Sequence, residues 1–280
     1  MPRPELSATR SLVWLYSSAP QRLALTALTA LEREIGESLR PGVDHQVAHT
    51  RLAWWREECT RTAQGHPSHP LTRELSALFP PMGAPPLAGL GGLVDTAVWD
   101  LSRATFDTRR ELTAYCERWS AAVIAPLTCL AVPEQTAARA SASAVGANLR
   151  EIELLLSLAP DARAGRLRVP LDELERADVP PESLARSPWS PALAGLLRAR
   201  HHALRAALAA AVDSLPPEAC RPLRGLMVWA TMACVASERA QARLPRESSP
   251  RDHHAPLDGW RAWRAARRVD RAASESTFRA

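Results

Sequence analysis

The sequence predicts an all-α, single-domain protein, and three observations support this. Hydrophobic residues make up 46% of the 280 positions but aromatic residues only 5%, so alanine and leucine dominate. A β-sandwich would need more β-branched and aromatic strands than this composition supplies. Apolar residues instead recur at the three- and four-residue spacing of amphipathic helices, with no strand–helix alternation and no internal repeat. The length is sufficient for a sizeable hydrophobic core.

The N-terminal part of the chain predicts two long helical stretches. Residues 8–35 form one helix or a broken pair, because Pro20 fits the first turn of a helix and damages an interior. Residues 44–64 form the next helix, in which the Asp44 side chain is expected to accept hydrogen bonds at the N-terminus. Three apolar side chains of this helix are expected to face the core: Val47, Leu52 and Trp55.

The helical pattern continues to about Pro245. Within it, Gly165 turns a short, hairpin-like segment at 163–170, and a proline-rich loop lies further on. We therefore expect a helical domain at 1–245 and an Arg-rich tail at 246–280 that is either an amphipathic helix or disordered. The further helices are predicted at residues 70–79, 87–103, 109–130, 133–159, 171–177, 191–213 and 217–240.

The charge distribution argues against nucleic-acid binding by the body of the chain. The formal net charge is +5, and all 35 cationic residues are arginine. Residues 259–280 hold six of these arginines against two acidic residues, so the preceding body is nearly neutral. No apolar run is long enough to span a membrane and no signal segment is apparent, so we expect a cytoplasmic protein, or one peripheral at the inner membrane. The five cysteines form no CxxC pair, which excludes a zinc ribbon.

Two segments carry a more specific signal. The first is Ala48-His-Thr-Arg-Leu-Ala-Trp-Trp-Arg-Glu-Glu58, and the second is Asp161-Ala-Arg-Ala-Gly-Arg-Leu-Arg-Val-Pro-Leu-Asp-Glu-Leu174. They resemble the LAWWR-type helix start and the EDARRGRxYLPLDEL-type segment of the squalene/phytoene synthase family. Weaker similarities extend this resemblance in order over residues 10–240. The resemblance implies the all-helical isoprenoid-synthase fold, with a central cavity between the helices.

The resemblance also implies a chemistry. Members of the family join two prenyl diphosphates head to head, beginning with loss of an allylic diphosphate whose charge Mg²⁺ neutralises. Two aspartate-rich helices hold those ions, because aspartates four residues apart lie on one helical face. The rest of the cavity is apolar, since water would quench the carbocation.

This chain departs from both aspartate motifs. The first, of the form DDxxD, falls on Gly36-Glu37-Ser38-Leu39-Arg40, so one acid of three remains and an arginine replaces the last aspartate. The second, of the form NxxxDxxxD, falls on Glu153, Ser157 and Asp161. Like charges about 4 Å apart repel by about 4 kcal/mol at an effective dielectric near 20, so Arg40 would oppose metal binding. We therefore expect that the trinuclear metal site is lost and that no cofactor is needed.

The resemblance still marks candidate ligand-binding residues. Glu37, Glu153 and Asp161 would be the metal ligands, for Mg²⁺, if the protein were active. The arginines after the second motif carry planar donors suited to phosphate oxygens, and a structural role in pairing with carboxylates is the alternative. The candidate ligand-binding set is Glu37, Arg40, Glu153, Ser157, Asp161, Arg163 and Arg166, and the candidate cavity walls are Trp54, Trp55 and Tyr115.

The histidines suggest a metal site only weakly. His45 and His49 lie four apart at a helix start, and His66 and His69 lie three apart in the following loop. Neither pair has a third convergent ligand in the sequence, which argues against a zinc-type site.

The C-terminal tail contains a pattern that is typical of helices lying on a membrane surface. Trp260 and Trp263 lie three residues apart among five arginines. Such a helix can lie on an anionic membrane surface, where each arginine contributes about 1 kcal/mol. A solvated tail is the alternative.

Three functions remain open. The lost metal ligands favour a catalytically silent member that keeps the fold as a binding or assembly module. In this the chain is similar to the mitochondrial respiratory complex I assembly factor of the family, which lacks the aspartate motifs, and this implies a protein partner. The second alternative is an active prenyl-diphosphate condensing transferase with an atypical metal site. The third is a metal-independent protein that binds an isoprenoid or lipid diphosphate, with Arg40 in place of the metal.

Overall fold

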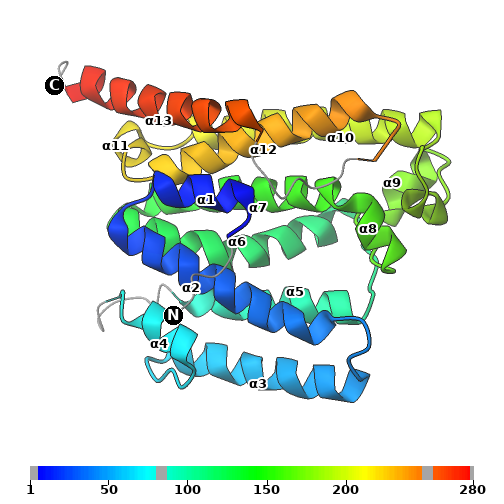
Figure 1. Cartoon of the computed structure of the whole chain (residues 1–280), viewed down its shortest axis with the longest axis horizontal. Helices are drawn as coiled ribbons and strands as arrows, with labels where there is room; N and C mark the ends of the chain where they lie inside the picture. The colour runs from blue at the N-terminus through cyan, green and yellow to red at the C-terminus, as the bar shows by residue number, and fades with distance from the viewer. Residues whose placement is uncertain (1–5, 80–86, 248–254, 278–280) are drawn as a thin grey trace.

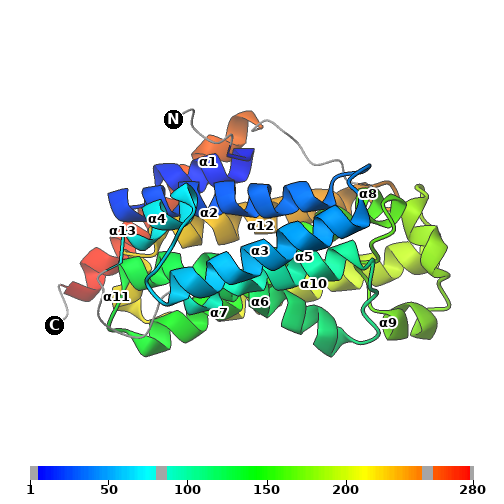
Figure 2. The ribbon, with the colours of Figure 1, turned by 90° about the horizontal axis from the view of Figure 1, so that it is seen from below.

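The computed structural model describes residues 6–79, 87–247 and 255–277, and over these ranges it contains helices and no strand. The predicted all-α fold is therefore confirmed for the described chain. The helices run roughly along the long axis in stacked tiers, with α13 (Pro256–Thr277) at one edge and α3 (His45–Ala63) at the opposite edge (Figure 1). Figure 2 shows the tiers from below, with α3 nearest the viewer.

The remaining elements fall into long and short helices. The other long helices are α2 (Ala19–Gly36), α6 (Arg109–Ala131), α7 (Thr136–Leu156), α10 (Pro191–Asp213) and α12 (Arg224–Arg243). The short α-helices are α1 (Ala8–Leu15), α4 (Pro70–Ser76), α5 (Gly92–Leu101), α8 (Leu158–Arg163), α9 (Leu171–Arg176) and α11 (Pro217–Cys220). Single 3₁₀ turns are η1 (Glu37–Leu39), η2 (Ala88–Gly91) and η3 (Pro181–Ala185).

The N-terminal stretch is a broken pair of helices. Ser18 begins α2 with a capping box, in which its backbone N–H donates to the Gln21 side chain at 3.0 Å, and Pro20 lies in the first turn. Hydrogen bonding at this break satisfies backbone groups that a helix end would leave open. The capping interactions at Ser18 therefore favour a broken pair of helices over one continuous helix.

Helix α3 begins where the sequence predicts and faces the core along a slightly different stripe. The Asp44 carboxylate accepts hydrogen bonds from the backbone N–H groups of Gln46 and Val47 at 2.9 and 3.2 Å. Leu52 and Trp55 are buried, but Val47 is exposed, so the expectation that it faces the core is wrong. The buried stripe starts at the next residue, and neighbouring residues on a helix point about 100° apart.

The core centres on the packing of α6 against α7. A Cβ atom at Gly146 of α7 would lie 2.2 Å from the Ser120 Oγ and 2.5 Å from the Ile124 Cγ1 of α6, so only glycine permits this approach. Trp119 of α6 is fully buried and meets Trp229 of α12 edge to face, with ring centroids 6.0 Å apart. This packing fixes the spacing between α2, α7 and α12, which enclose the site.

The segment after α8 is a tight turn with no strand. Gly165 adopts a φ of +81°, in the left-handed region, and the backbone N–H of Arg166 donates to the Asp161 carbonyl at 2.8 Å. The turn brings Arg166 and Arg168 back towards the Asp161 side chain. It therefore places two cations beside the last residue of the second motif.

The tail forms a helix that docks on the bundle. Ala262, Ala265 and Ala266 of α13 are buried against a small cluster that includes Leu12 of α1 and Met232 of α12. Small side chains allow close helix–helix contact, and α13 lies along α12 in Figure 1. The sequence predicts that the tail is either an amphipathic helix or disordered, and the part of it that the structure describes is a helix.

Candidate functional site

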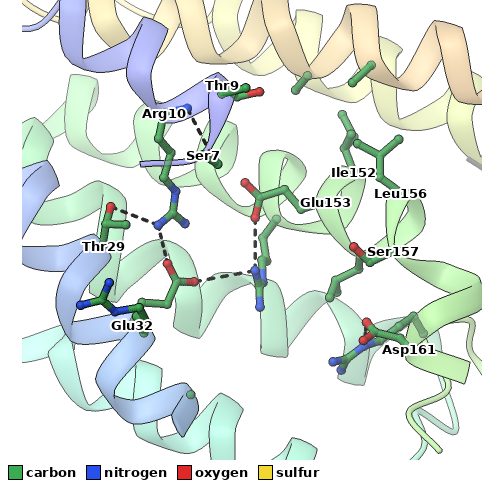
Figure 3. Close-up of a pocket in the computed structure, with 18 of the residues that line it drawn as sticks. Ser7, Thr9, Arg10, Thr29, Glu32, Ile152, Glu153, Leu156, Ser157 and Asp161 are labelled. Carbon is green, nitrogen blue, oxygen red and sulfur yellow. Dashed lines mark hydrogen bonds and ion pairs between the residues drawn. The ribbon is translucent and has the colours of Figure 1, made fainter. Parts of the chain in front are cut away.

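A cavity of about 980 Å³ lies among α1, α2, α7, α8 and α12 (Figure 3). Part of its wall is apolar, with Ile152, Leu156 and Met232 among the lining side chains. It opens to solvent, because the lining residues Arg33 and Arg243 are exposed. Its volume suits a small-molecule ligand with an extended apolar part.

The polar part of the lining is rich in charge, with arginine in excess. The lining acids are Glu32, Asp100, Glu153, Asp161 and Asp258, and the lining arginines are Arg10, Arg33, Arg40, Arg150, Arg166, Arg168, Arg239 and Arg243. With these groups ionised, the charged lining is net positive. A cavity of this kind favours an anionic ligand over a bare cation.

Glu32 lies at the centre of one ionic cluster. Its carboxylate contacts the Arg10 guanidinium at 2.6 Å (Figure 3). It also lies 3.8 Å from the Arg150 guanidinium and accepts a hydrogen bond from the Trp119 Nε1 at 2.8 Å. Burial by itself raises the pKa of Glu32, but the two guanidinium groups outweigh it and hold that pKa at about 2. Arg150 also contacts Glu153 at 3.2 Å. Both carboxylates are therefore already paired with arginine.

Asp161 belongs to a second cluster. It accepts hydrogen bonds from the Arg166 terminal nitrogen at 2.7 Å and from the Arg168 Nε at 2.8 Å. Arg168 continues to Asp100, which it contacts with both terminal nitrogens at 2.7 and 3.0 Å. The Tyr115 hydroxyl donates to the same Asp100 carboxylate at 3.2 Å. Both acids are thus held by donors from several elements.

Asp258 in the first turn of α13 is the fifth lining acid. It accepts hydrogen bonds from Arg239 of α12, one of them at 3.1 Å, and contacts Arg261 at 3.2 Å. Although burial raises its pKa, the bond from Arg239 and the backbone N–H of Ala255 lower it below the ordinary value. This ion pair fastens the start of α13 to the cavity wall.

The structure brings most of the predicted ligand-binding residues to this cavity. Arg40, Glu153, Ser157, Asp161 and Arg166 all line it. The sequence thus placed the second motif on a cavity-facing surface of α7 and α8, although its acids meet arginines there.

Two predicted residues lie outside the cavity lining. Glu37, in the turn η1, pairs with Arg40 at 2.7 Å, because the two residues are three apart at the end of α2. Arg163 pairs with Glu247 at 3.0 Å on the surface. Of the first motif, Gly36, Leu39 and Arg40 line the cavity, and none of them offers a carboxylate.

The three candidate cavity walls also lie elsewhere among the described residues. Trp55 packs in the main core. Trp54 is exposed and contacts the Trp55 ring edge to face, with ring centroids 4.9 Å apart. Tyr115 is buried in a separate cluster with Phe106, and it contacts the site through its hydroxyl bond to Asp100 and through the Arg168 guanidinium, 5.5 Å from its ring centre. Trp54 and Trp55 belong to α3, and no residue of α3 lines the cavity.

Sequence reasoning missed several residues of the site. Glu32 lies four residues before Gly36 and therefore on the same face of α2, a spacing that could have indicated it. Arg168 stands within the segment quoted for the resemblance. Arg10 and Arg150 carry no local signal, because only the packing of α1 and α7 beside α2 brings them to Glu32.

A magnesium site would need lining carboxylates that are free of other partners. Magnesium needs carboxylate oxygens that are free to enter its octahedral shell, whereas each lining acid has an arginine at 3.2 Å or less. Among the described residues no group of three acidic, histidine or cysteine side chains is arranged to hold a metal ion. The His45 and His49 rings contact each other with nitrogens 3.0 Å apart, and no further ligand joins them in the described chain.

The helical fold, with its charged and solvent-open cavity among the helices, is that of an isoprenoid-synthase-like protein. The squalene/phytoene synthase family model matches residues 4–261, and the chain belongs to that family. A search of curated proteins finds no match. No helix in the part of the chain that the structure describes has the length and apolar character needed to cross a membrane.

Two solved structures are similar in fold. One is a dehydrosqualene synthase in complex with ligand, with a TM-score of 0.72 and 17% identity over 94% of this chain and 91% of that chain. The other is squalene synthase HpnC from Alicyclobacillus acidocaldarius, with a TM-score of 0.65 and 17% identity over 84% of this chain and 88% of that chain. At this identity the likeness establishes the fold.

Proposed function

We propose that this protein is a non-catalytic member of the family whose cavity binds an anionic amphiphile, a prenyl or lipid diphosphate, without a metal ion. The observation that carries the proposal is the pairing of every lining carboxylate with arginine. A carboxylate held in this way cannot ligate Mg²⁺ without breaking a charge-assisted bond. The site therefore keeps the cavity of a synthase without its means of activating diphosphate.

The positive end of the cavity supplies the binding chemistry. Arg33 and Arg243 line it, and neither has a carboxylate partner among the described residues. Guanidinium groups bind phosphate oxygens through paired N–H donors. The apolar wall, including Ile152, Leu156 and Met232, would accept the hydrocarbon part of the same ligand.

Binding of this kind does not amount to catalysis. Loss of an allylic diphosphate requires strong neutralisation of the charge that develops on the leaving group, which a metal ion supplies as a Lewis acid. Here most of the lining guanidinium groups are already neutralised by acids of the protein. We infer that a bound diphosphate is retained intact. If the protein acts as an assembly module, its protein partner would bind the outer surface of the fold while the ligand fills the cavity.

Farnesyl diphosphate provides the test. We expect it to raise the melting temperature of the protein equally in EDTA and in Mg²⁺, with no release of pyrophosphate, because a ligand of the native state stabilises it by mass action. Arg243→Glu should weaken binding at least tenfold, since a hydrogen bond to a charged group is worth about 1.5–3 kcal/mol. Arg246→Glu is the matched control, because this exposed arginine lies three residues further on and outside the cavity lining.

Two outcomes would overturn the proposal. Release of pyrophosphate that depends on Mg²⁺ would favour the active condensing transferase. Absence of a melting shift in EDTA, with a shift that appears only on adding Mg²⁺, would show that the site still uses a metal. Farnesol, which lacks the diphosphate, separates the contribution of the arginines from that of the apolar wall.

A further inference from the structure

More of the exposed large hydrophobic side chains lie on α13 than on any other helix of the described chain. Three of the seven large hydrophobic side chains that are exposed lie on this helix: Leu257 at 58%, Trp260 at 51% and Trp263 at 49%. The opposite face of the same helix is buried through its alanines. The helix is therefore anchored on one side and presents two indole rings to solvent on the other.

Unpaired arginines surround these rings. The Arg264 guanidinium lies 4.5 Å from the centre of the Trp260 ring, and that of Arg267 lies 5.8 Å from the Trp263 ring. Both arginines are exposed, as are Arg268 and Arg271 further along. None of the four has a carboxylate partner within the described ranges.

Two acids of α13 are taken up by contacts with the bundle. Asp258 is held by Arg239 of α12, and Asp270 contacts Arg224 of α12 at 3.3 Å. Asp258 and Asp270 therefore both bind α13 to α12. The outward face is left with an uncompensated positive charge beside two aromatic rings.

We propose that this outer face of α13 is an interfacial contact for an anionic lipid membrane. Tryptophan rings have an apolar body and a polar N–H, which suits the level of the lipid headgroups, and arginine is attracted to anionic lipids. The exposed apolar side chains occupy only the first two turns of α13, which fits shallow insertion into a membrane surface. A symmetric contact with a second copy would bring the same arginines together, so charge opposes that alternative.

The proposed membrane contact lies next to the cavity. Asp258 and Arg239 line the cavity, and Leu257 and Trp260 flank Asp258 in sequence. The membrane-facing turn therefore adjoins the cavity wall. The membrane contact itself depends on α13 alone and stands or falls separately from the ligand proposed for the cavity.

Vesicle flotation of the full-length protein tests the proposal. We expect binding to vesicles of equal parts phosphatidylcholine and phosphatidylglycerol, weakening with added salt, and little binding to phosphatidylcholine alone. The double variants Trp260→Ala with Trp263→Ala, and Arg264→Glu with Arg267→Glu, should each lower vesicle affinity at least tenfold. All four side chains are exposed, so the melting temperature of each variant should stay close to that of the wild type.

Matched controls come from the other edge of the molecule. Trp54 and Arg51 are exposed on α3, and Arg110 is exposed at the start of α6. Trp54→Ala, and Arg51→Glu with Arg110→Glu, change the same residue types and the same net charge and should leave vesicle binding intact.

Three results would overturn the inference. The first is failure of the wild type to float with the mixed vesicles. The second is an equal loss of binding in the α3 controls, which would indicate a general charge effect. The third is a wild-type dimer in solution that the Trp260→Ala, Trp263→Ala variant dissociates, which would assign the face to a second copy of the chain.

Discussion

Asp161 is bound by Arg168, whose Nε donates to its carboxylate at 2.8 Å. Asp161 is the last residue of the second aspartate motif and the one that the sequence retains unchanged. Its retention suggests a metal ligand, yet a guanidinium occupies the oxygen that such a ligand would use. A motif residue can therefore persist in this fold as one half of an ion pair.

Removing Arg168 should destabilise the protein strongly. Arg168 is 4% exposed and pairs with two largely buried acids, so Arg168→Ala leaves Asp100 without its arginine and Asp161 with Arg166 alone. We expect a loss of about 3–5 kcal/mol in unfolding free energy, measured by denaturant titration. Arg176→Ala, which breaks a largely exposed pair with Asp172, should cost less than about 1 kcal/mol. Equal losses in the two variants would contradict the buried-pair account.

Glu58 should make the protein sensitive to acid. Burial raises the pKa of this carboxyl, but the backbone N–H of His69 and the hydroxyls of Ser68 and Thr72 hydrogen-bond to it and lower that pKa to about 2. Its stabilising effect is complete above the pKa of the unfolded chain, near 4.5, and is lost as the pH falls from there to about 2.

The corresponding variant is Glu58→Gln. At pH 7 we expect it to lower the unfolding free energy by about 3 kcal/mol, and the difference from the wild type should shrink as the pH falls below 4.5. Glu57→Gln is the control, because Glu57 is exposed on the same helix. A difference that stays constant between pH 7 and pH 2 would show that ionisation of Glu58 does not matter.

Any side chain larger than that of glycine at position 146 should destabilise the packing of α6 against α7. The added methyl of Gly146→Ala would overlap Ser120 and Ile124, and overpacking of this kind typically costs about 1–3 kcal/mol. Gly195→Ala in α10 meets no atom within 4 Å and should instead stabilise by about 0.5–1 kcal/mol, since alanine favours a helix interior. Thermal unfolding with opposite signs for the two variants would verify the packing.

Restoring acids should create a response to magnesium. Gly36, Arg40 and Ser157 line the cavity, and a side chain at Gly36 meets nothing within 4 Å. We expect Mg²⁺ to raise the melting temperature of the triple aspartate variant and not of the wild type, because carboxylates are the ligands that Mg²⁺ prefers. The triple asparagine variant has the same shape without the charge and should not respond. If the aspartate variant also ignores Mg²⁺, the assignment of these positions to the two aspartate motifs is wrong.

Much of the fold was accessible to sequence reasoning because its signals are local. Helical spacing and the capping side chains at Ser18 and Asp44 mark where helices begin, and such signals act within one turn. The error at Val47 has the same origin, since the sequence shows an apolar residue on a helix but not which stripe the neighbouring helices cover. The ordered state of α13 likewise depended on its alanine contacts with α1 and α12.

The sequence by itself determined the helical class, the family and the absence of aspartates at Gly36, Arg40 and Ser157, because these follow from residue type and from order along the chain. Only the tertiary structure decided that the surviving acids are taken up by arginine. Glu32 meets Arg10 and Arg150 across three helices, and Asp161 shares Arg168 with Asp100 of α5. Ion pairing depends on distance through space and on burial, and neither quantity is encoded in the spacing of residues within one helix.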